Sequence, residues 1–206
     1  MSDSTPAHLP ARPDPTDRHP ALAQTRAWVA RAVVGLNLCP FAKAPWVKGQ
    51  IRFVLCEASD PQVLLDTLCA QMHALAQGDP EQLETTLVVH PNVLGDFGEF
   101  NDFLDRAEAA VDDLGYAGVL QVASFHPHYQ FAGTAANDLG NATNRSPFPT
   151  LHLLREASVE RAVAAIPQAA SIYETNVRTL QALGPKGWAQ LQAQCRRDAL
   201  HPGEPD

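Results

Sequence analysis

The residues best suited to chemistry in this sequence gather in one polar segment between Ser124 and Glu156. The segment separates two apolar runs, and a connection longer than about 12 to 15 residues in a compact domain is usually either functional or disordered. Tyr129, Phe131 and Phe148 supply apolar area that a solvated linker lacks, so we interpret the segment as ordered. Its polar residues are His126, His128, Tyr129, Gln130, Asn137, Asp138, Asn141, Asn144, Arg145 and Ser146.

His126 is the candidate general acid or base in this segment. It follows the apolar run VLQVASF and precedes Pro127. Histidine titrates near neutrality, and its neutral nitrogen binds zinc or iron, so His126 and His90 could form an acid/base pair or two metal ligands. The structural alternative is that each histidine ends a strand and bonds only to a loop carbonyl, and this alternative weighs more for His90.

Arg145 and Arg155 flank the rigid Ser-Pro-Phe-Pro sequence and are candidates for anion binding. The guanidinium fork recognises carboxylate or phosphate with two hydrogen bonds, and neighbouring side chains can add neutral donors. A structural ion pair, for instance of Arg155 with Glu156 or Asp138, is an equally weighted alternative. The candidate substrate-binding residues are Tyr129, Asn144, Arg145, Ser146 and Arg155.

Cys39 lies in the sequence GLNLCPFAK, close to Lys43 and Lys48. A cation or an imidazole nearby would lower the pKa of this thiol and make Cys39 a nucleophile, whereas an apolar turn would simply bury it. The chain has no Cys-x-x-Cys pair, and the spacing fits a reducing compartment. The remaining cysteines match strand or helix patterns and are expected to pack in the core; they are Cys56, Cys69 and Cys195.

Hydrophobic periodicity predicts the elements that position these residues. Strands are expected at 51–56, 85–89, 119–125 and 150–155, with helices between them, although a helix near Ser158 could extend back into the last strand. The alternation predicts an α/β fold with a single domain over residues 21–200, a partly parallel sheet of about four strands, flanking helices and the long polar loop. The first three strands should be neighbours with at least one parallel pair, which would place His90 and His126 at one edge of the sheet.

Length and composition exclude several classes of protein. The chain has 206 residues, which fits one domain, and its formal charge of -8 without a basic run disfavours nucleic-acid binding. Residues 1–20 contain five prolines and no aromatic residue and are expected to be a disordered tail, and residues 201–206 a frayed end. Neither an apolar signal core nor a membrane-length span is evident, so we expect a cytoplasmic protein that does not bind membranes.

The run His126-Pro-His128-Tyr-Gln130 is similar to the His-Pro-His-x-Gln segment of the galactose-1-phosphate uridylyltransferase branch of the histidine-triad superfamily. That resemblance implies that His128 takes a nucleotidyl group and that Gln130 holds phosphoryl oxygens. The fold of that family is an antiparallel barrel, which conflicts with the alternation of strands and helices in this chain.

A second resemblance covers the chain from about Thr25 to Leu183. The segments GLNLCPFAK, FNDFLD, SFHPHYQF and NRSPFPTLHLLREASVERA together resemble a bacterial family catalogued as domain of unknown function 1415. The resemblance implies no reaction. In that family the position of His128 is often another polar residue, which weakens the uridylyltransferase interpretation and leaves as better candidates His126, Asn144, Arg145 and Ser146.

The functional hypothesis is an enzyme that acts on a small anionic metabolite, a hydrolase or transferase with Cys/His chemistry. Arg145 and Asn144 would hold the anion, His126 would be the acid or base, and Cys39 would be the nucleophile. The alternative is a non-catalytic module that binds a metal or an anion, with His126, His90 and Cys39 as ligands. A third class is a structural or interaction protein without pocket chemistry. Cofactor and oligomeric state are not predicted.

Overall fold

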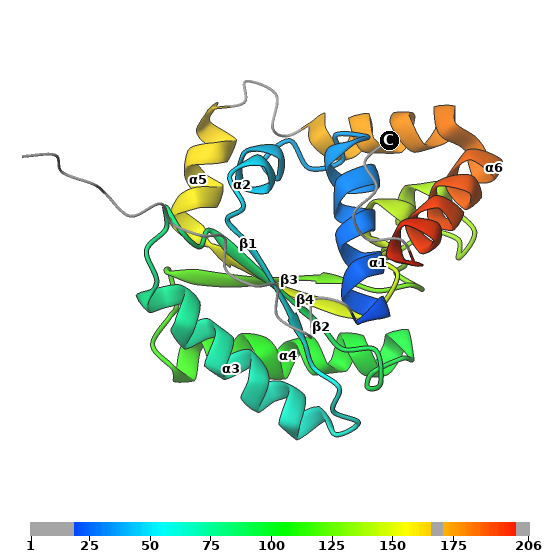
Figure 1. Cartoon of the computed structure of the whole chain (residues 1–206). Helices are drawn as coiled ribbons and strands as arrows, with labels where there is room; N and C mark the ends of the chain where they lie inside the picture. Colours follow the sequence, from blue (N-terminus) through cyan, green and yellow to red (C-terminus); the bar gives the residue numbers. More distant parts are fainter. Residues whose placement is uncertain (1–18, 166–170, 201–206) are drawn as a thin grey trace, which may run out of the picture.

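The sheet has four strands whose order differs from their order along the chain. In the computed structural model, which describes residues 19–165 and 171–200, the strands are β1 (Ile51–Leu55), β2 (Thr85–Val89), β3 (Leu120–Phe125) and β4 (Thr150–Arg155). Their order in the sheet is β1-β2-β4-β3 (Figure 1). β1 and β2 are parallel, and β4 is antiparallel to both β2 and β3. The predicted single α/β domain with a partly parallel sheet is confirmed.

The position of β4 corrects one detail of the prediction. β3 is not a neighbour of β2, because β4 lies between them and pairs with both. The long loop at 126–149 returns the chain antiparallel to β3, and β4 then supplies the hydrogen-bonding edge to β2. As a result, the carboxyl ends of β1, β2 and β3 and the amino end of β4 lie at one edge of the sheet, which we call the loop edge.

Two helices cover one face of the sheet, the lower face in Figure 1. They are α3 (Pro61–Gln77) and α4 (Phe97–Asp113). α3 begins at Asp60, whose side chain accepts the N–H of Gln62 at 2.7 Å, as Asx caps commonly do. Four fully buried side chains follow at helical spacing on α3, and each contributes about 1.5 to 3 kcal/mol of transfer free energy on burial; they are Leu64, Leu68, Met72 and Leu75.

The opposite face is covered by α1 (Pro20–Trp28), the π-helix η2 (Val29–Val34) and the long helix α6 (Ile172–Leu200). α1 is capped by His19, whose Nδ1 accepts the N–H of Ala21, so the expected tail does not include His19 and Pro20. The predictions for residues 1–18 and 201–206 lie outside the described residues. α6 is interrupted at Gly184, and its second half, residues 185–200, packs against α1 (Figure 1).

Three short helices complete the described chain. They are α2 (Lys43–Val47), the 3-10 helix η3 (Leu139–Asn144) inside the long loop, and α5 (Glu156–Ala165). β4 ends at Arg155 and α5 begins at the next residue, so the predicted strand keeps its full length. Within residues 19–165 and 171–200, none of the helices combines the length and apolar character needed to cross a membrane.

Candidate functional site

The loop at 126–149 is held in shape by Asn141, which has no exposed surface. Its Oδ1 accepts the N–H of Phe131 at 3.0 Å and the hydroxyl of Thr134 at 2.9 Å, and its Nδ2 donates to the carbonyl of Ala135 at 2.9 Å. All three hydrogen bonds of this side chain are made with other residues of the loop. Asn141 is therefore a structural residue that organises the site rather than a ligand-binding residue.

Arg145 connects two other parts of the same loop. Its Nε donates to the carbonyl of Tyr129 at 3.0 Å, and its Nη2 donates to the carbonyl of Ala136 at 2.7 Å. Partial burial lowers the pKa of Arg145, and the nearby carboxylate of Asp138 opposes that shift, so the guanidinium remains charged. Nη1 has no hydrogen-bond partner among the described residues.

Tyr129 and Asn144 also hold the loop in place. The ring of Tyr129 contacts the rings of Phe97 and Phe131, with centroid distances of 5.2 and 5.0 Å. Asn144 donates from Nδ2 to the carbonyl of Ser124 at 3.4 Å. Neither residue lines the cavity next to Arg145 that is described below. Their predicted role in substrate binding stays a prediction, and the contacts show how they pack.

His126 is fully buried, and both of its ring nitrogens are engaged. Nδ1 accepts the N–H of His128 at 3.0 Å, so Nε2 carries the hydrogen that points to the carbonyl of Leu94 at 3.2 Å. The ring also contacts Phe97 and Phe100 at centroid distances of 5.4 and 5.0 Å. Burial is the main cause that lowers the pKa of His126. The role of general acid or base therefore stays a prediction that this geometry does not support.

His90 lies at the same edge of the sheet as His126, as the strand pattern predicts. It is fully buried, its Nδ1 lies 3.1 Å from the carbonyl oxygen of Val93, and its ring stacks on Phe100. Burial lowers the pKa of His90 to about 4, so the imidazole is neutral at pH 7. Across residues 19–165 and 171–200, no three His, Cys, Asp or Glu side chains form a group able to hold a metal. The predicted metal site of His126, His90 and Cys39 is therefore not assembled.

Cys39 lies in the turn after η2, outside the cavity that contains Arg145. The turn is anchored through the carbonyl of Leu38, which accepts the amide N–H of Asn176 at 2.6 Å. Burial raises the pKa of the Cys39 thiol, and the backbone N–H groups of Phe41 and Ala42 oppose the shift only in part. The groups that act on the thiol include neither an imidazole nor a lysine, so the activation that a nucleophile needs is missing.

Arg155 is separated from Arg145 by the length of β4. It pairs with Leu120 at the edge opposite the loop edge, about 17 Å along a strand of this length. Its guanidinium donates to the carbonyls of Leu75, Gly78 and Leu83 at 2.6, 2.9 and 3.1 Å, which satisfies the carboxyl end of α3. The sequence placed both arginines around one rigid segment, but the segment leads into a strand that carries Arg155 away. Arg155 therefore does not share an anion with Arg145.

A cavity of about 110 Å³ lies where the long loop meets α1 and the second half of α6. We call it the loop cavity. Ser146 lines it, and its hydroxyl donates to the carbonyl of Phe148 at 2.5 Å. The polar side chains that line it come from three segments of the chain: Arg145 and Ser146 from the loop, Gln24 and Trp28 from α1, and Gln192 and Arg196 from α6.

Both charged side chains that are described in the lining of the loop cavity are cationic. Arg145 and Arg196 line it, and none of the Asp or Glu residues in 19–165 and 171–200 does. Arg196 is exposed and has no hydrogen bond or ion pair with any described residue. Trp28 is buried, and its Nε1 hydrogen has no partner within the described part of the chain. The sequence predicted Arg145 and Ser146 in a site but missed Trp28 and Arg196, because helical spacing alone indicates only a core or a surface position.

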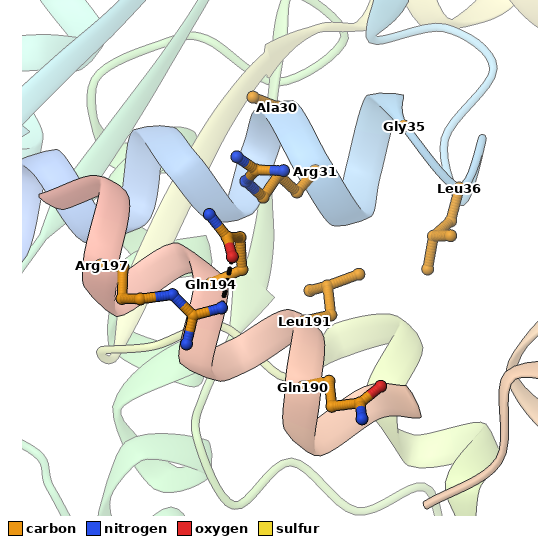
Figure 2. Close-up of a pocket in the computed structure, with 8 residues that line it drawn as sticks. All are labelled: Ala30, Arg31, Gly35, Leu36, Gln190, Leu191, Gln194 and Arg197. Atoms are coloured by element: carbon orange, nitrogen blue, oxygen red, sulfur yellow. Dashed lines mark hydrogen bonds between the residues drawn. The ribbon is translucent and has the colours of Figure 1, made fainter. Parts of the chain in front are cut away.

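A second, wider depression of about 760 Å³ lies between η2 and α6. Figure 2 shows Arg31 on η2 facing α6, and the side chain of Leu191 pointing from α6 towards η2. Arg31 is paired with Asp198, and Arg197 donates to Gln194. The depression is shallow and its guanidinium groups already have partners, so we regard the smaller loop cavity as the better candidate.

Comparison with known proteins places the chain in a family. Neither the curated proteins nor the solved structures gave a match. A family model described as protein of unknown function (DUF1415) matches residues 20–190. The matched range contains α1, the whole sheet and the long loop, and it ends before Gln192 and Arg196. Because the match covers most of the sequence, the chain belongs to the DUF1415 family, as the sequence motifs predicted.

Proposed function

We propose that the protein binds a small anionic molecule in the loop cavity. The observation that carries this proposal is the pair of guanidinium groups, Arg145 and Arg196, in a lining to which the described residues contribute no carboxylate. The chain as a whole has a formal charge of -8, so this lining has the opposite charge to the protein around it. A local excess of positive charge in a partly enclosed cavity is the usual requirement for anion binding.

Magnitudes indicate which groups would supply the affinity. An anion at about 4 Å from a guanidinium gains about 4 kcal/mol at an effective dielectric constant near 20, before its desolvation is subtracted. A neutral hydrogen bond, such as one from Gln24 or Trp28, contributes about 0.5 to 1.5 kcal/mol net. The two arginines would therefore dominate the affinity, and the neutral donors would orient the ligand.

The same contacts favour binding over catalysis as the proposed activity. His126 has both nitrogens engaged, and Cys39 does not line the loop cavity. Cys195 does line it, but burial raises the pKa of its thiol to about 11, so the thiol is protonated at neutral pH. A reaction on the bound anion stays a prediction from the sequence.

We further propose a cytoplasmic location, supported by four cysteines that form no disulfide.

The proposal is tested by calorimetric titration with phosphate, sulfate and acetate at constant ionic strength. Arg196→Gln is the informative variant, because Arg196 is exposed and has no hydrogen bond or ion pair within the described part of the chain whose loss would disturb the fold. We expect this variant to weaken binding about tenfold, which corresponds to about 1.4 kcal/mol. The matched control is Arg161→Gln on α5, where the guanidinium bonds to Ser158 and Arg161 does not line the loop cavity.

Arg161→Gln should leave the affinity unchanged. If no anion binds at millimolar concentration, or if both variants lose affinity equally, the loop cavity is not the binding site. Arg145→Gln is less suitable as a first test, because it also removes the hydrogen bonds to Tyr129 and Ala136 that hold the loop.

A further inference from the structure

We propose that the group bound in the loop cavity is a doubly charged phosphoryl group rather than a carboxylate. This inference rests on the proposed function and assigns its ligand class. Three features of the cavity support it: the number of positive charges, the directions from which its donors come, and its size.

The charges favour a dianion. Two guanidinium groups line the cavity, so a carboxylate with one charge would leave one guanidinium uncompensated. Asp138 acts on Arg145 from outside the lining, where its carboxylate accepts the N–H of Gly140. Next to Cys195, Arg31 on η2 and Asp198 on α6 form an ion pair, and their charges largely cancel.

The donors favour a tetrahedral group. The side chains that carry donors and line the cavity come from three directions: Arg145 from the loop, Trp28 from α1 and Arg196 from α6. Nη1 of Arg145 and Nε1 of Trp28 have no hydrogen-bond partner among the described residues. A carboxylate has two oxygens in one plane, and one arginine fork can satisfy both of them. A phosphoryl group presents three strong acceptor oxygens in different directions. The indole nitrogen can only donate, so an acceptor oxygen on the ligand would be a suitable partner for its unmatched hydrogen.

The size limits what can enter. The cavity of about 110 Å³ is well below the roughly 300 to 1,000 Å³ of pockets that enclose drug-sized ligands, so it suits a phosphoryl group better than a whole phosphate monoester. Any remaining part of a phosphate monoester must therefore lie outside. Gln192 and Arg196 are the exposed residues of the lining, so the substituent would leave the cavity beside them.

The test compares methyl phosphate, inorganic phosphate, sulfate and acetate by calorimetry. The second pKa of a phosphate monoester is about 6, so methyl phosphate is a dianion at about pH 8 and mostly a monoanion at about pH 5. Sulfate stays doubly charged at both pH values. A change in its affinity between them therefore measures the effect of titrating groups of the protein itself. We expect the affinity of methyl phosphate relative to sulfate to fall about tenfold from pH 8 to pH 5, as the dianion fraction falls about tenfold. At about pH 8, acetate should bind at least about tenfold more weakly than methyl phosphate, because one charge is missing.

A variant that removes one neutral donor tests the geometry. Trp28→Phe replaces the indole with a smaller phenyl ring and removes the Nε1 hydrogen, and we expect the affinity for methyl phosphate to fall about fivefold to tenfold. Trp188→Phe is the matched control, since Trp188 is also buried but does not line the cavity. Melting temperatures of both variants verify that they are folded.

The outcomes separate the two proposals. Absence of binding by every anion overturns the proposed function itself. Acetate binding as tightly as methyl phosphate, or a ratio to sulfate that does not change with pH, leaves an anion site but overturns the phosphoryl assignment. A higher affinity for inorganic phosphate than for methyl phosphate supports the assignment and identifies the free ion, rather than a monoester, as the ligand.

Discussion

The Nε2 of His126 lies 3.2 Å from the carbonyl oxygen of Leu94, a residue held at a positive φ of 56°. A branched residue rarely adopts this left-handed conformation, which costs about 1 to 2 kcal/mol. The hydrogen bond joins the segment after β2 to the segment after β3 at the loop edge. His126 thus stabilises a strained turn, and its burial serves the fold.

His126→Ala should lower the free energy of unfolding by about 2 to 4 kcal/mol, because it removes a buried ring and leaves the carbonyl of Leu94 without its donor. His128→Ala is the matched control: the neighbouring side chain is exposed, and its removal should change stability by no more than about 0.5 kcal/mol. Urea denaturation of both variants measures the difference. A catalytic residue without a structural role would instead give two variants of equal stability.

Stability should decrease as the pH falls from about 6.5 to about 4. The pKa of His90 is lowered to about 4 in the folded protein, below the value of 6.5 in the unfolded chain. Between these values the unfolded chain binds a proton that the folded protein does not, so unfolding becomes easier as the pH falls. The contribution of His90 approaches about 3 kcal/mol. His152, whose pKa is also lowered to about 4 by burial, adds to the same window.

His90→Asn isolates the contribution of His90. The asparagine amide can replace the Nδ1 hydrogen that points to Val93 but does not titrate. Urea denaturation between about pH 7.5 and 4.5 should show a smaller loss of stability for this variant than for the natural chain. Identical pH profiles for the two proteins would contradict the lowered pKa of His90.

The secondary structure was predictable from the sequence because local patterns determine it. Asp60 and Pro61 mark the beginning of α3, and an alternating or fully apolar run marks each strand. The insertion of β4 between β2 and β3 could not be predicted in this way. It depends on where a loop of more than twenty residues returns, and the hydrogen bonds of Asn141 that shape this loop join residues up to 10 positions apart.

The candidate site was predicted only in part, for a related reason. Arg145 and Ser146 come from the polar loop that drew attention in the sequence, and both line the loop cavity. Trp28 and Arg196 reach the same cavity from the two ends of the chain through the packing of α6 on α1. Nothing in their local sequence distinguishes them from core or surface residues. The role of Cys39 stays a prediction: the sequence suggested an accessible thiol in a turn, whereas the thiol is partly buried.

Cys39 should react slowly with iodoacetamide at pH 7 in the folded protein. Burial raises the pKa of the thiol, so the reactive thiolate is rarer than in an unperturbed cysteine with a pKa of about 8.5. Alkylation followed by peptide mass spectrometry gives the rate at each cysteine, with the urea-unfolded protein as the reference. Cys39→Ser should also leave anion binding unchanged, because Cys39 does not line the loop cavity. Rapid alkylation of Cys39 in the folded protein would restore it as a candidate nucleophile.

The break in α6 at Gly184 gives the last prediction. Gly184 has φ 71° and ψ 171°, a conformation that is nearly restricted to glycine, and a Cβ at this position would contact nothing within 4 Å. Gly184→Ala should therefore destabilise the protein by about 1 to 3 kcal/mol through backbone strain alone. Because this break directs residues 185–200 onto α1, the variant should also bind anions more weakly, with Arg196 displaced from the loop cavity.

Gly95→Ala is the matched control, since its Cβ would also meet no atom and its φ is not positive. Urea denaturation and calorimetry of both variants measure the two effects, and a Gly184→Ala protein as stable as Gly95→Ala would show that the chain does not need this conformation.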